Sequence, residues 1–277
     1  MEVDLHIHTT ASDGTSAPQE VVEIAAYYGL RAIAITDHDE VGGITPALLA
    51  GRLTGIEVIP GIEINTEYEQ REVHILGYFI DYHDPKLLAQ LKRLQDARLI
   101  RISKIVNALR QLGLPIELTR VRELAGNGSI GRPHIGMAMI EQGYVKSIQE
   151  AFHRYIGYGC PAYVPRYKIG PEEAVELILG AKGVPILAHP GLVNRDDLIP
   201  KLVKVGLQGL EVYYPEHEPW MVSKYLKLTD KYGLIATGGS DYHGNKANYR
   251  ADIGTVTVSY QVVDQLKECQ RLNLYKV

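Results

Sequence analysis

The sequence opens with two histidines and an acid in close succession. His6 and His8 stand two residues apart in an apolar stretch that is typical of a strand, and Asp13 follows in a polar loop. Residues two apart on a strand share a face, so we expect both imidazoles to point the same way. Imidazole and carboxylate together, without thiolate, are ligands suited to Mn, Zn or Fe ions. The first fourteen residues therefore predict the beginning of a metal site.

The same kind of side chain recurs near the ends of later apolar runs. Burying so many ionisable groups without a compensating ion would be costly, so packing alone does not explain them. The predicted ligand set comprises nine side chains: His6, His8, Asp13, His38, Glu63, His74, His189, Asp241 and His243. They are too many for one ion and suffice for two or three, and Glu63 is a natural bridge because its two oxygens can serve two cations. Paired metals are the usual machinery of phosphoester hydrolysis.

These side chains need a scaffold that brings strand ends together. Helical stretches such as 171–183 and 219–233 alternate with apolar, β-rich runs near 3–8, 31–36, 56–63, 73–79, 184–188, 208–213, 234–237 and 253–258. This alternation predicts parallel β/α units in a barrel or an open sheet. In β/α barrels the functional site lies at the carboxyl ends of the strands, where most predicted ligands fall. His74 lies early in its run and joins the site only if that strand runs antiparallel or starts later.

Residues 85–160 break this rhythm and contain no convincing strand. Apolar residues at three- and four-residue steps predict a long helix from about 86 to 112, followed by helices at 117–125, 133–142 and 147–155. Between residues 86 and 157, twelve Lys and Arg stand against five acids, a net charge of +7 in a chain of net charge −4. Either an anionic partner or a solvated helical surface explains that charge. We interpret 85–160 as an inserted helical domain within a barrel domain of residues 1–84 and 161–277.

Several short motifs follow one another along the chain. They are Asp4-Leu5-His6-Ile7-His8, Thr36-Asp37-His38, Gly61-Ile62-Glu63 followed by His74, Ala188-His189-Pro190 and Ser240-Asp241-Tyr242-His243. Together they resemble the ordered motifs of the PHP (polymerase and histidinol phosphatase) superfamily, over residues 1–81 and 160–255. The resemblance implies an α/β fold, a distorted seven-stranded (β/α) barrel, with two or three metal ions, often manganese, at the strand ends.

The resemblance also implies how the ligands divide. One ion would be held by His6, His8, Glu63 and Asp241, a second by Glu63, His74 and His189, and a third by Asp13, His38 and His243. Asp4 and Asp37 would orient ligands from behind. A metal-bound hydroxide held by Glu63, Asp241 and His189 would then attack a phosphorus atom in line.

A motif in the insertion narrows the substrate. Gly131-Arg132-Pro133-His134 resembles the phosphate-binding motif of the PHP branch that contains 3′,5′-nucleoside bisphosphate phosphatases and a related 5′-to-3′ exoribonuclease, and residues 210–217 are also similar to it. Arg offers a planar fork to phosphate oxygens, and His134 adds a donor if it is protonated. The plainer interpretation of Arg132 is a surface charge near a helix start. On the functional interpretation, the insertion forms a basic lid over the barrel mouth. His217 is a weaker candidate for a substrate contact.

The sequence thus predicts a metal-dependent phosphatase that removes the 3′-phosphate of nucleoside 3′,5′-bisphosphates. The first alternative is 5′-to-3′ trimming of short 5′-phosphorylated RNA, which a basic groove with stacking aromatics would favour. Histidinol-phosphate hydrolysis ranks below both because of the Gly131–His134 motif and the basic insertion. A non-catalytic metal-binding domain would be expected to lose several ligands, and this sequence keeps the whole set.

Composition agrees with a globular enzyme, since hydrophobic residues make up 45% and charged residues 22% of the chain. No stretch approaches eighteen uninterrupted apolar residues, so no membrane span is expected. Cys160 and Cys269 lie far apart, and the N-terminus lacks the pattern of a secretory signal. We therefore expect a cytoplasmic protein without a disulfide framework, whose partner is a small nucleotide or short RNA, and no sequence feature indicates an obligate protein partner.

Overall fold

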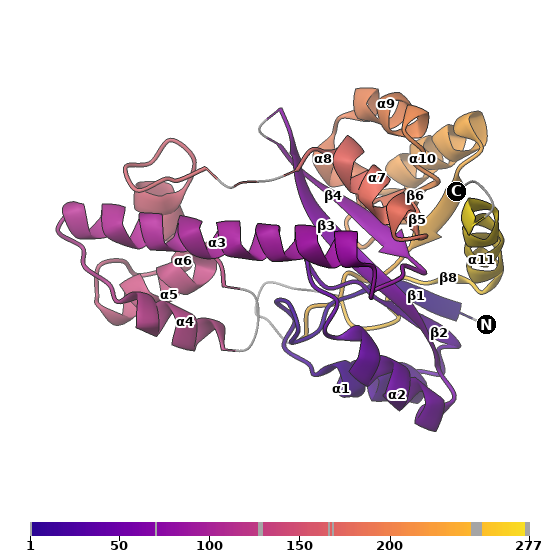
Figure 1. Cartoon of the computed structure of the whole chain (residues 1–277), viewed down its shortest axis with the longest axis horizontal. Coiled ribbons are helices and arrows are strands. Elements are labelled where there is room, and N and C mark those ends of the chain that lie inside the picture. The colour runs from indigo at the N-terminus through magenta and orange to yellow at the C-terminus, as the bar shows by residue number, and fades with distance from the viewer. Residues whose placement is uncertain are drawn as a thin grey trace. The chain divides into compact units, whose positions relative to one another are not determined.

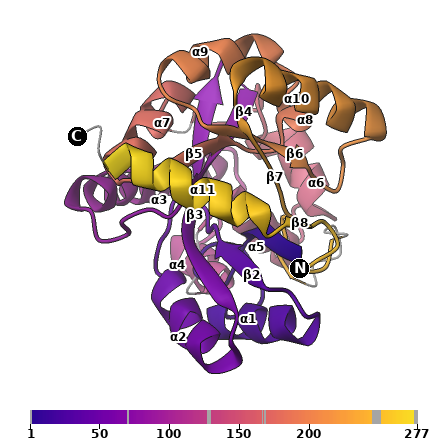
Figure 2. The same ribbon diagram turned by 90° about the vertical axis from the view of Figure 1, so that its right-hand side faces the viewer.

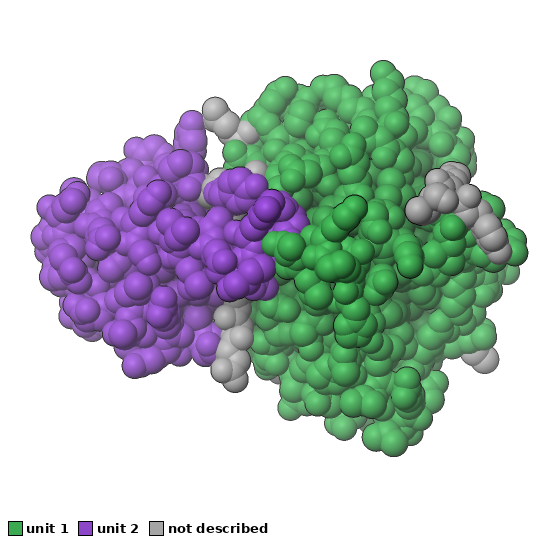
Figure 3. All heavy atoms as spheres, viewed as in Figure 1, with its two compact units in different colours: residues 1–89, 168–277 green, residues 90–167 purple. Residues whose placement is uncertain are grey.

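The computed structural model describes residues 2–69, 71–126, 130–165, 167, 169–244 and 251–274. The chain divides into two compact units, unit 1 with residues 1–89 and 168–277 and unit 2 with residues 90–167 (Figure 3). These borders differ by a few residues from those expected at 84/85 and 160/161. All nine predicted metal ligands belong to unit 1, whereas Arg132 and His134 belong to unit 2.

One sheet organises unit 1 (Figure 1). Its strands are β1 (Glu2–Ile7), β2 (Ala32–Ile35), β3 (Glu57–Tyr68), β4 (Arg71–Tyr78), β5 (Val184–Leu187), β6 (Gly209–Tyr213), β7 (Ile235–Gly238) and β8 (Val258–Ser259). They lie in the order β7-β6-β5-β4-β3-β2-β1-β8. The described sheet therefore has eight strands and not the seven expected, because the short β8 pairs antiparallel with the start of β1.

The sheet curls into a nearly closed barrel. Beyond the end of β7, Tyr242 forms a parallel bridge with Ile7, and its carbonyl accepts a hydrogen bond from the His8 amide at 2.9 Å. Gly239 makes this approach possible, because a Cβ at that position would collide with the backbone of His6. The two sides of the sheet thus meet at the carboxyl end of β1, where the first predicted ligands stand.

Strand β4 runs antiparallel to both of its neighbours. Its register with β3 sets Glu63 opposite Leu76 and Asn65 opposite His74. His74 is therefore a diagonal neighbour of Glu63 on the same face of the sheet. His74 was expected to join the site only if its strand ran antiparallel or started later, and the strand runs antiparallel.

Seven α-helices cover the sheet of unit 1 within the described residues: α1 (Pro18–Tyr27), α2 (Ile44–Thr54), α7 (Pro171–Gly180), α8 (Pro190–Val193), α9 (Ile199–Lys204), α10 (Pro219–Tyr232) and α11 (Gln261–Leu274). Four of them begin with proline, whose fixed φ suits the first helical position and whose missing N–H is not needed there. The segment 196–206 begins with a 3₁₀ turn, Asp196–Leu198, before α9. Helix α11 packs against β5, β7 and β8 (Figure 2).

The strand expected at 253–258 is largely absent. Only Val258 of that range is in a strand, and Asp252 to Thr255 form a turn in which Gly254 has φ +83°. The Gly254 amide donates to Asp4 Oδ2 at 2.9 Å. The backbone of this segment, which was expected to pair with a neighbouring strand, instead binds the side chain of Asp4 on β1.

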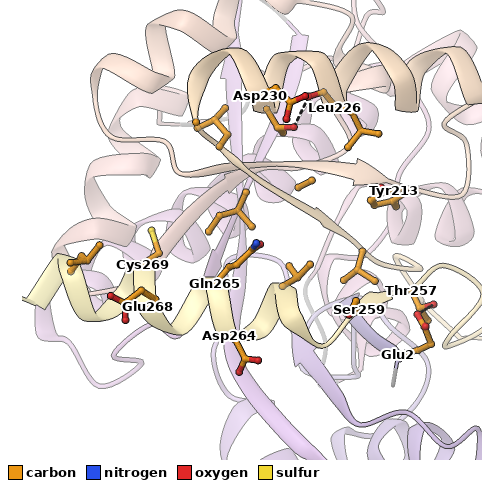
Figure 4. Close-up of a pocket in the computed structure, with 18 residues that line it drawn as sticks. Glu2, Tyr213, Leu226, Asp230, Thr257, Ser259, Asp264, Gln265, Glu268 and Cys269 are labelled. Carbon is orange, nitrogen blue, oxygen red and sulfur yellow. Dashed lines mark hydrogen bonds between the residues drawn. The ribbon is translucent and has the colours of Figure 1, made fainter.

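A surface pocket of about 990 Å³ opens beside β7 and α11 (Figure 4). Its wall is largely apolar and includes Leu226, Ile235, Val258 and Leu272. None of the predicted metal ligands is among the described residues that line it. The pocket is therefore separate from the candidate site described below.

The described part of unit 2 is helical. Helix α3 (Pro85–Gln111) enters it, and α4 (Leu118–Ala125), α5 (Arg132–Glu141), α6 (Ile148–Ala151) and a π-helical turn, Phe152–Ile156, follow. Its own core gathers apolar side chains from these helices, among them Leu109, Val121, Ile135 and Met139. Among the described residues, no helix combines the length and apolar character needed to span a bilayer.

Candidate metal centre

The first candidate ligand group brings together side chains from β1 and the residue after it, from β3 and from the loop after β7. His6 Nε2 lies 3.4 Å from Glu63 Oε2 and 3.2 Å from Asp241 Oδ1. His8 Nε2 lies 3.3 Å and 3.0 Å from the same two oxygens. Two imidazoles and two carboxylates thus place one ligand atom each within 4.8 Å of one another. This is the group that the sequence analysis expected for the first ion.

A second group uses the other oxygen of Glu63. Glu63 Oε1 lies 2.8 Å from His74 Nδ1 and 3.1 Å from His189 Nε2. His38 Nδ1 lies 2.9 Å from Glu63 Oε2, and His38, Glu63 and His74 satisfy the spacing of a metal site. Glu63 therefore faces both groups. His38, which was expected in the third group, also lies beside the second.

The third group contains His8, Asp13, His38 and His243. Asp13 Oδ1 lies 3.3 Å from His243 Nε2 and 3.8 Å from His8 Nδ1. A neutral imidazole has only one nitrogen with a free lone pair, so His8 cannot serve this group and the first one together as a neutral ligand. Its shorter distances assign it to the first group, which leaves Asp13, His38 and His243 for the third.

Several buried atoms of this cluster have no hydrogen-bond partner. His6 Nε2, His8 Nε2 and Glu63 Oε2 are unpaired although their side chains are almost completely buried. Buried polar groups without partners are expensive, and nitrogen lone pairs that face carboxylate oxygens repel one another unless a cation or a proton stands between them. A set of nitrogen and oxygen donors without thiolate fits a divalent transition metal such as Mn, Zn or Fe. The residues present therefore fit the expected ions.

Charges within the cluster shift the pKa values of its members. Burial lowers the pKa of His8, but Asp241 and Glu63 beside it raise the value to about 10. Burial also opposes the charge on His74, yet Glu63 and Glu72 raise its pKa to about 9. Burial would raise the pKa of Glu63, but the neighbouring histidines hold it well below its usual range. Without metal, protons therefore occupy the positions between imidazoles and carboxylates.

Asp4 and Asp37, which were expected to orient ligands, hold the backbone that carries them. Asp4 Oδ1 accepts from the amides of Ser240 at 2.9 Å and His6 at 3.3 Å. Asp37 accepts from the Thr9 amide at 2.8 Å and from the Ser12 hydroxyl at 2.6 Å. One acid thus fixes the loop that leads to Asp241, and the other fixes the loop that leads to Asp13.

Two ligands have strained backbones. His189 has φ +26° and Asp241 has φ +52°, a region that residues with a side chain rarely occupy. Such conformations persist only when the surroundings enforce them, and they gather at functional sites. Both residues lie two or three positions past the ends of β5 and β7, in the turns that place their side chains in the cluster.

Two side chains that touch this cluster were not in the predicted set. Glu211, fully buried on β6, accepts hydrogen bonds from His6 Nδ1 and from the His189 amide, both at 2.8 Å. The Tyr214 hydroxyl donates to Asp241 Oδ2 at 3.0 Å. An acid in the middle of an apolar strand was the available signal for Glu211, whereas no local signal distinguishes Tyr214 from the many other tyrosines of the chain.

His217, the weaker candidate for a substrate contact, contacts the backbone through both ring nitrogens. Its Nε2 accepts from the Gly191 amide at 3.1 Å, and its Nδ1 donates to the Val212 carbonyl at 2.9 Å. Burial lowers its pKa and keeps the ring neutral. Both ring nitrogens are thus bonded to the backbone, so His217 holds the chain that follows His189, and its contact with a substrate stays a prediction.

Arg132 and His134 stand in the first turn of α5. His134 Nδ1 accepts from the Gly131 amide at 3.0 Å, which caps the helix. The Arg132 guanidinium lies 4.9 Å from the centre of the Phe152 ring and donates to the Ile156 carbonyl at 3.4 Å. These contacts fix the motif within unit 2, and its role toward phosphate stays a prediction.

Comparison with known proteins gives relatives that match most of the chain. A 3′,5′-nucleoside bisphosphate phosphatase of Chromobacterium violaceum is 34% identical over 247 residues, which cover 87% of each chain. A phosphoribosyl 1,2-cyclic phosphate 1,2-diphosphodiesterase of Eggerthella lenta is 32% identical over 87% of this chain and 94% of its own. A 5′-3′ exoribonuclease of Haemophilus influenzae is 34% identical over 87% of this chain and 89% of its own.

Structural comparison agrees. A crystal structure from Bifidobacterium adolescentis, described as that of a metal-dependent phosphoesterase, superposes with a TM-score of 0.84 and 30% identity over 97% of this chain and 96% of its own. The model of the PHP domain family matches residues 4–176. The match includes six of the nine predicted ligands, and the superposition with the Bifidobacterium adolescentis structure covers nearly the whole chain. The chain belongs to the PHP domain family and is a phosphoester hydrolase.

Proposed function

We propose that this protein removes the 3′-phosphate of nucleoside 3′,5′-bisphosphates, such as adenosine 3′,5′-bisphosphate. The reaction would use two or three bound divalent ions, for which Mn²⁺ is the first candidate and Zn or Fe the alternatives. The observation that carries the proposal is the meeting of nine acids and histidines, from seven parts of the chain, around Glu63 and Asp241. The named activity of the Chromobacterium violaceum relative supports the substrate class.

In this proposal each ion has its own ligands. The first would be held by His6, His8, Glu63 and Asp241, the second by Glu63, His74 and His189, and the third by Asp13, His38 and His243. Ions bound there would lower the pKa of water and neutralise charge on phosphate oxygens.

The chain's own residues supply position and access. Glu63 is 1% exposed and His8 is fully buried, whereas the Asp13 side chain is 35% exposed. The third group therefore marks the side from which solvent and substrate reach the cluster. Arg132 and His134 would hold a substrate phosphate through the guanidinium fork and the second ring nitrogen.

Phosphate release from a panel of substrates tests the proposal. The panel contains adenosine 3′,5′-bisphosphate, AMP, histidinol phosphate and phosphoribosyl 1,2-cyclic phosphate, each with Mn²⁺ and after chelation. We expect release from the bisphosphate with Mn²⁺ only. Asp241→Asn, purified in the same way, controls for contaminating phosphatases. Undiminished turnover in chelator would contradict a metal-dependent reaction, and preference for another substrate would overturn the substrate class alone.

Exonucleolytic trimming of short RNA is the second candidate. The Haemophilus influenzae relative favours it, and so do the twelve basic residues against five acids between residues 86 and 157. A 5′-phosphorylated RNA trinucleotide separates the two activities, because an exonuclease releases mononucleotides from it and a nucleotide phosphatase does not. Comparing kcat/KM for this trinucleotide and for the bisphosphate shows which reaction dominates.

A further inference from the structure

Strand β6 supplies none of the predicted ligands, yet the segment that begins with it contacts three ligand-bearing segments. We propose that Glu211, Tyr214 and His217 together form a positioning segment, which sets the orientation of His6, His189 and Asp241 before any ion arrives. The proposal rests on the metal centre of the proposed function. It concerns residues that touch ligands and not substrate, so they are positioning residues.

Glu211 is the centre of this segment because each of its oxygens has a different partner. Oε1 accepts the proton of His6 Nδ1, and Oε2 accepts the amide proton of His189, both at 2.8 Å. A proton on Nδ1 leaves the lone pair of His6 on Nε2, the atom that faces Glu63 and Asp241. Glu211 thereby selects the tautomer of one ligand and fixes the backbone of another.

Tyr214 contacts a third predicted ligand, Asp241. Its hydroxyl donates to Asp241 Oδ2, while Asp241 Oδ1 faces His6 and His8. One carboxylate oxygen is thus occupied, and the other is turned toward the first ligand group. Because Asp241 sits in a strained backbone with φ +52°, this hydrogen bond helps to hold an orientation that the loop alone does not favour.

His217 holds the chain that carries His189. Its ring joins the Gly191 amide to the Val212 carbonyl, so it ties the start of α8 to the end of β6. The rings of His189 and Tyr214 have centroids 5.2 Å apart, and those of Tyr214 and His217 lie 5.3 Å apart. The packing of these rings makes the segment a single support for His6 and Asp241 of the first ligand group and His189 of the second.

Glu211→Gln is the decisive variant. Its amide can present oxygen to only one of the two donors, so either His6 loses its acceptor or the His189 amide faces an N–H group. Two measurements are needed: the ¹H–¹⁵N signal of the His6 Nδ1–H group in the metal-free protein, which reports its hydrogen bond to Glu211 whether or not Nε2 is also protonated, and Mn²⁺ affinity by calorimetry. Glu57→Gln is the matched control, because Glu57 lies at the start of β3 and pairs with Lys267.

In the wild type we expect a slowly exchanging Nδ1–H signal of His6, shifted downfield by the hydrogen bond to Glu211. In Glu211→Gln we expect this signal to move upfield or to broaden through exchange, and we expect a loss of Mn²⁺ affinity of about 10–100-fold, the usual cost of removing a partner of a metal ligand. Glu57→Gln should leave both values unchanged. A His6 Nδ1–H signal and an affinity like those of the wild type in Glu211→Gln would overturn the inference.

A second variant guards against misfolding of the first. Tyr214→Phe removes only the hydroxyl and should weaken Mn²⁺ binding by about 10-fold, whereas Tyr213→Phe, one residue earlier, should not. Equal affinity in Tyr214→Phe and wild type would overturn the part of the inference that concerns Asp241. If the wild type itself bound no Mn²⁺, the proposed function would fail, and the Nδ1–H signal of metal-free His6 would still decide the role of Glu211.

Discussion

At the scale of single residues, protons in the metal-free protein take the positions between imidazoles and carboxylates that metal ions would occupy. Glu63 and Asp241 raise the pKa of His8 to about 10, and Glu63 and Glu72 raise that of His74 to about 9, although burial acts against both. Both values lie above 7, so these protons are bound at neutral pH in the metal-free protein and must leave when metal binds. We expect Mn²⁺ binding to release protons at pH 7 and to tighten as pH rises from 6 toward 9.

Calorimetry in buffers of different ionisation enthalpy measures this release directly. The observed heat should change with the buffer in proportion to the number of protons released. Heats that are independent of the buffer, together with an affinity that is flat between pH 6 and 8, would contradict the proton-filled cluster.

Glu63 is the side chain on which most contacts converge. Its two oxygens face separate ligand groups, so Glu63→Gln removes a charge from both while it keeps the size of the side chain. We expect more than about 100-fold lower Mn²⁺ affinity, beyond the usual cost of removing an outer partner, and a bound-metal content reduced by more than one ion per chain. Elemental analysis after dialysis measures the content. Loss of a single ion would show that Glu63 does not bridge.

Arg132 tests the contribution of unit 2 to substrate binding. Arg132→Gln removes the charged fork, and a hydrogen bond to a charged group contributes about 1.5–3 kcal/mol, so we expect KM for the bisphosphate to rise at least about 10-fold. Arg122→Gln, on α4, is the matched control for the loss of one basic charge. Equal KM values for the two variants would assign Arg132 to the helix surface.

The residue types of the candidate ligands were readable from the sequence because their chemistry is local to each motif. The partners of those residues were not. Glu211 acts on His6 across 205 positions of the chain, and that distance is bridged only by the order of the strands. His217 shows the converse, because its place past a strand end suggested chemistry, while its actual partners are the backbone atoms of Gly191 and Val212.

At the scale of elements, the direction of β4 decides whether His74 reaches Glu63. Hydrophobic alternation indicates a strand but not its direction. The sequence therefore predicted the run at 73–79 and left open whether it runs parallel or antiparallel to its neighbours. The long hairpin of β3 and β4 resolves it, and β3 runs to Tyr68, past the expected end at residue 63. The strand expected at 253–258 is largely absent because the backbone amide of Gly254 binds Asp4, a contact that hydrophobic alternation does not reveal.

Gly239 offers a test of how closely the elements must meet. A Cβ there would collide with His6 and approach Asp4 Oδ1 to 2.9 Å, so Gly239→Ala must push the loop of Asp241 away from β1. We expect the free energy of unfolding to fall by about 1–3 kcal/mol, as for other overpacked sites, and bound metal to decrease.

Gly180→Ala is the matched control for that change. Gly180 is the last residue of α7, and a Cβ there would meet no atom within 4 Å. Because alanine restricts the unfolded chain more than glycine does, Gly180→Ala should be neutral or stabilising by up to about 1 kcal/mol. Chemical denaturation measures both variants, and equal effects would show that the approach at Gly239 is not tight.

At the scale of the whole molecule, the sequence indicated the α/β organisation and a helical segment interrupting it, because periodicity changes from strand-like to helical near residue 85. It did not indicate how the sheet closes. That closure depends on the approach of Gly239 to His6 and on the bridge between Ile7 and Tyr242, contacts between the two ends of the chain that no local pattern encodes.

The two units have separate hydrophobic cores, and this separation predicts how metal stabilises the molecule. The core of unit 2 is built from residues 102–162, whereas the predicted ligands are anchored in the core of unit 1, among strands that include Val3, Ile59 and Ile186. Mn²⁺ at 100 times its dissociation constant should stabilise unit 1 by about 2.7 kcal/mol, and the opening of unit 2 should not change. Hydrogen exchange measures each unit by its own peptides. Slower exchange in β1, β3 and β4 with unchanged α4 and α5 is expected, Glu63→Gln should abolish the difference, and equal protection of both units would mean that they unfold as one.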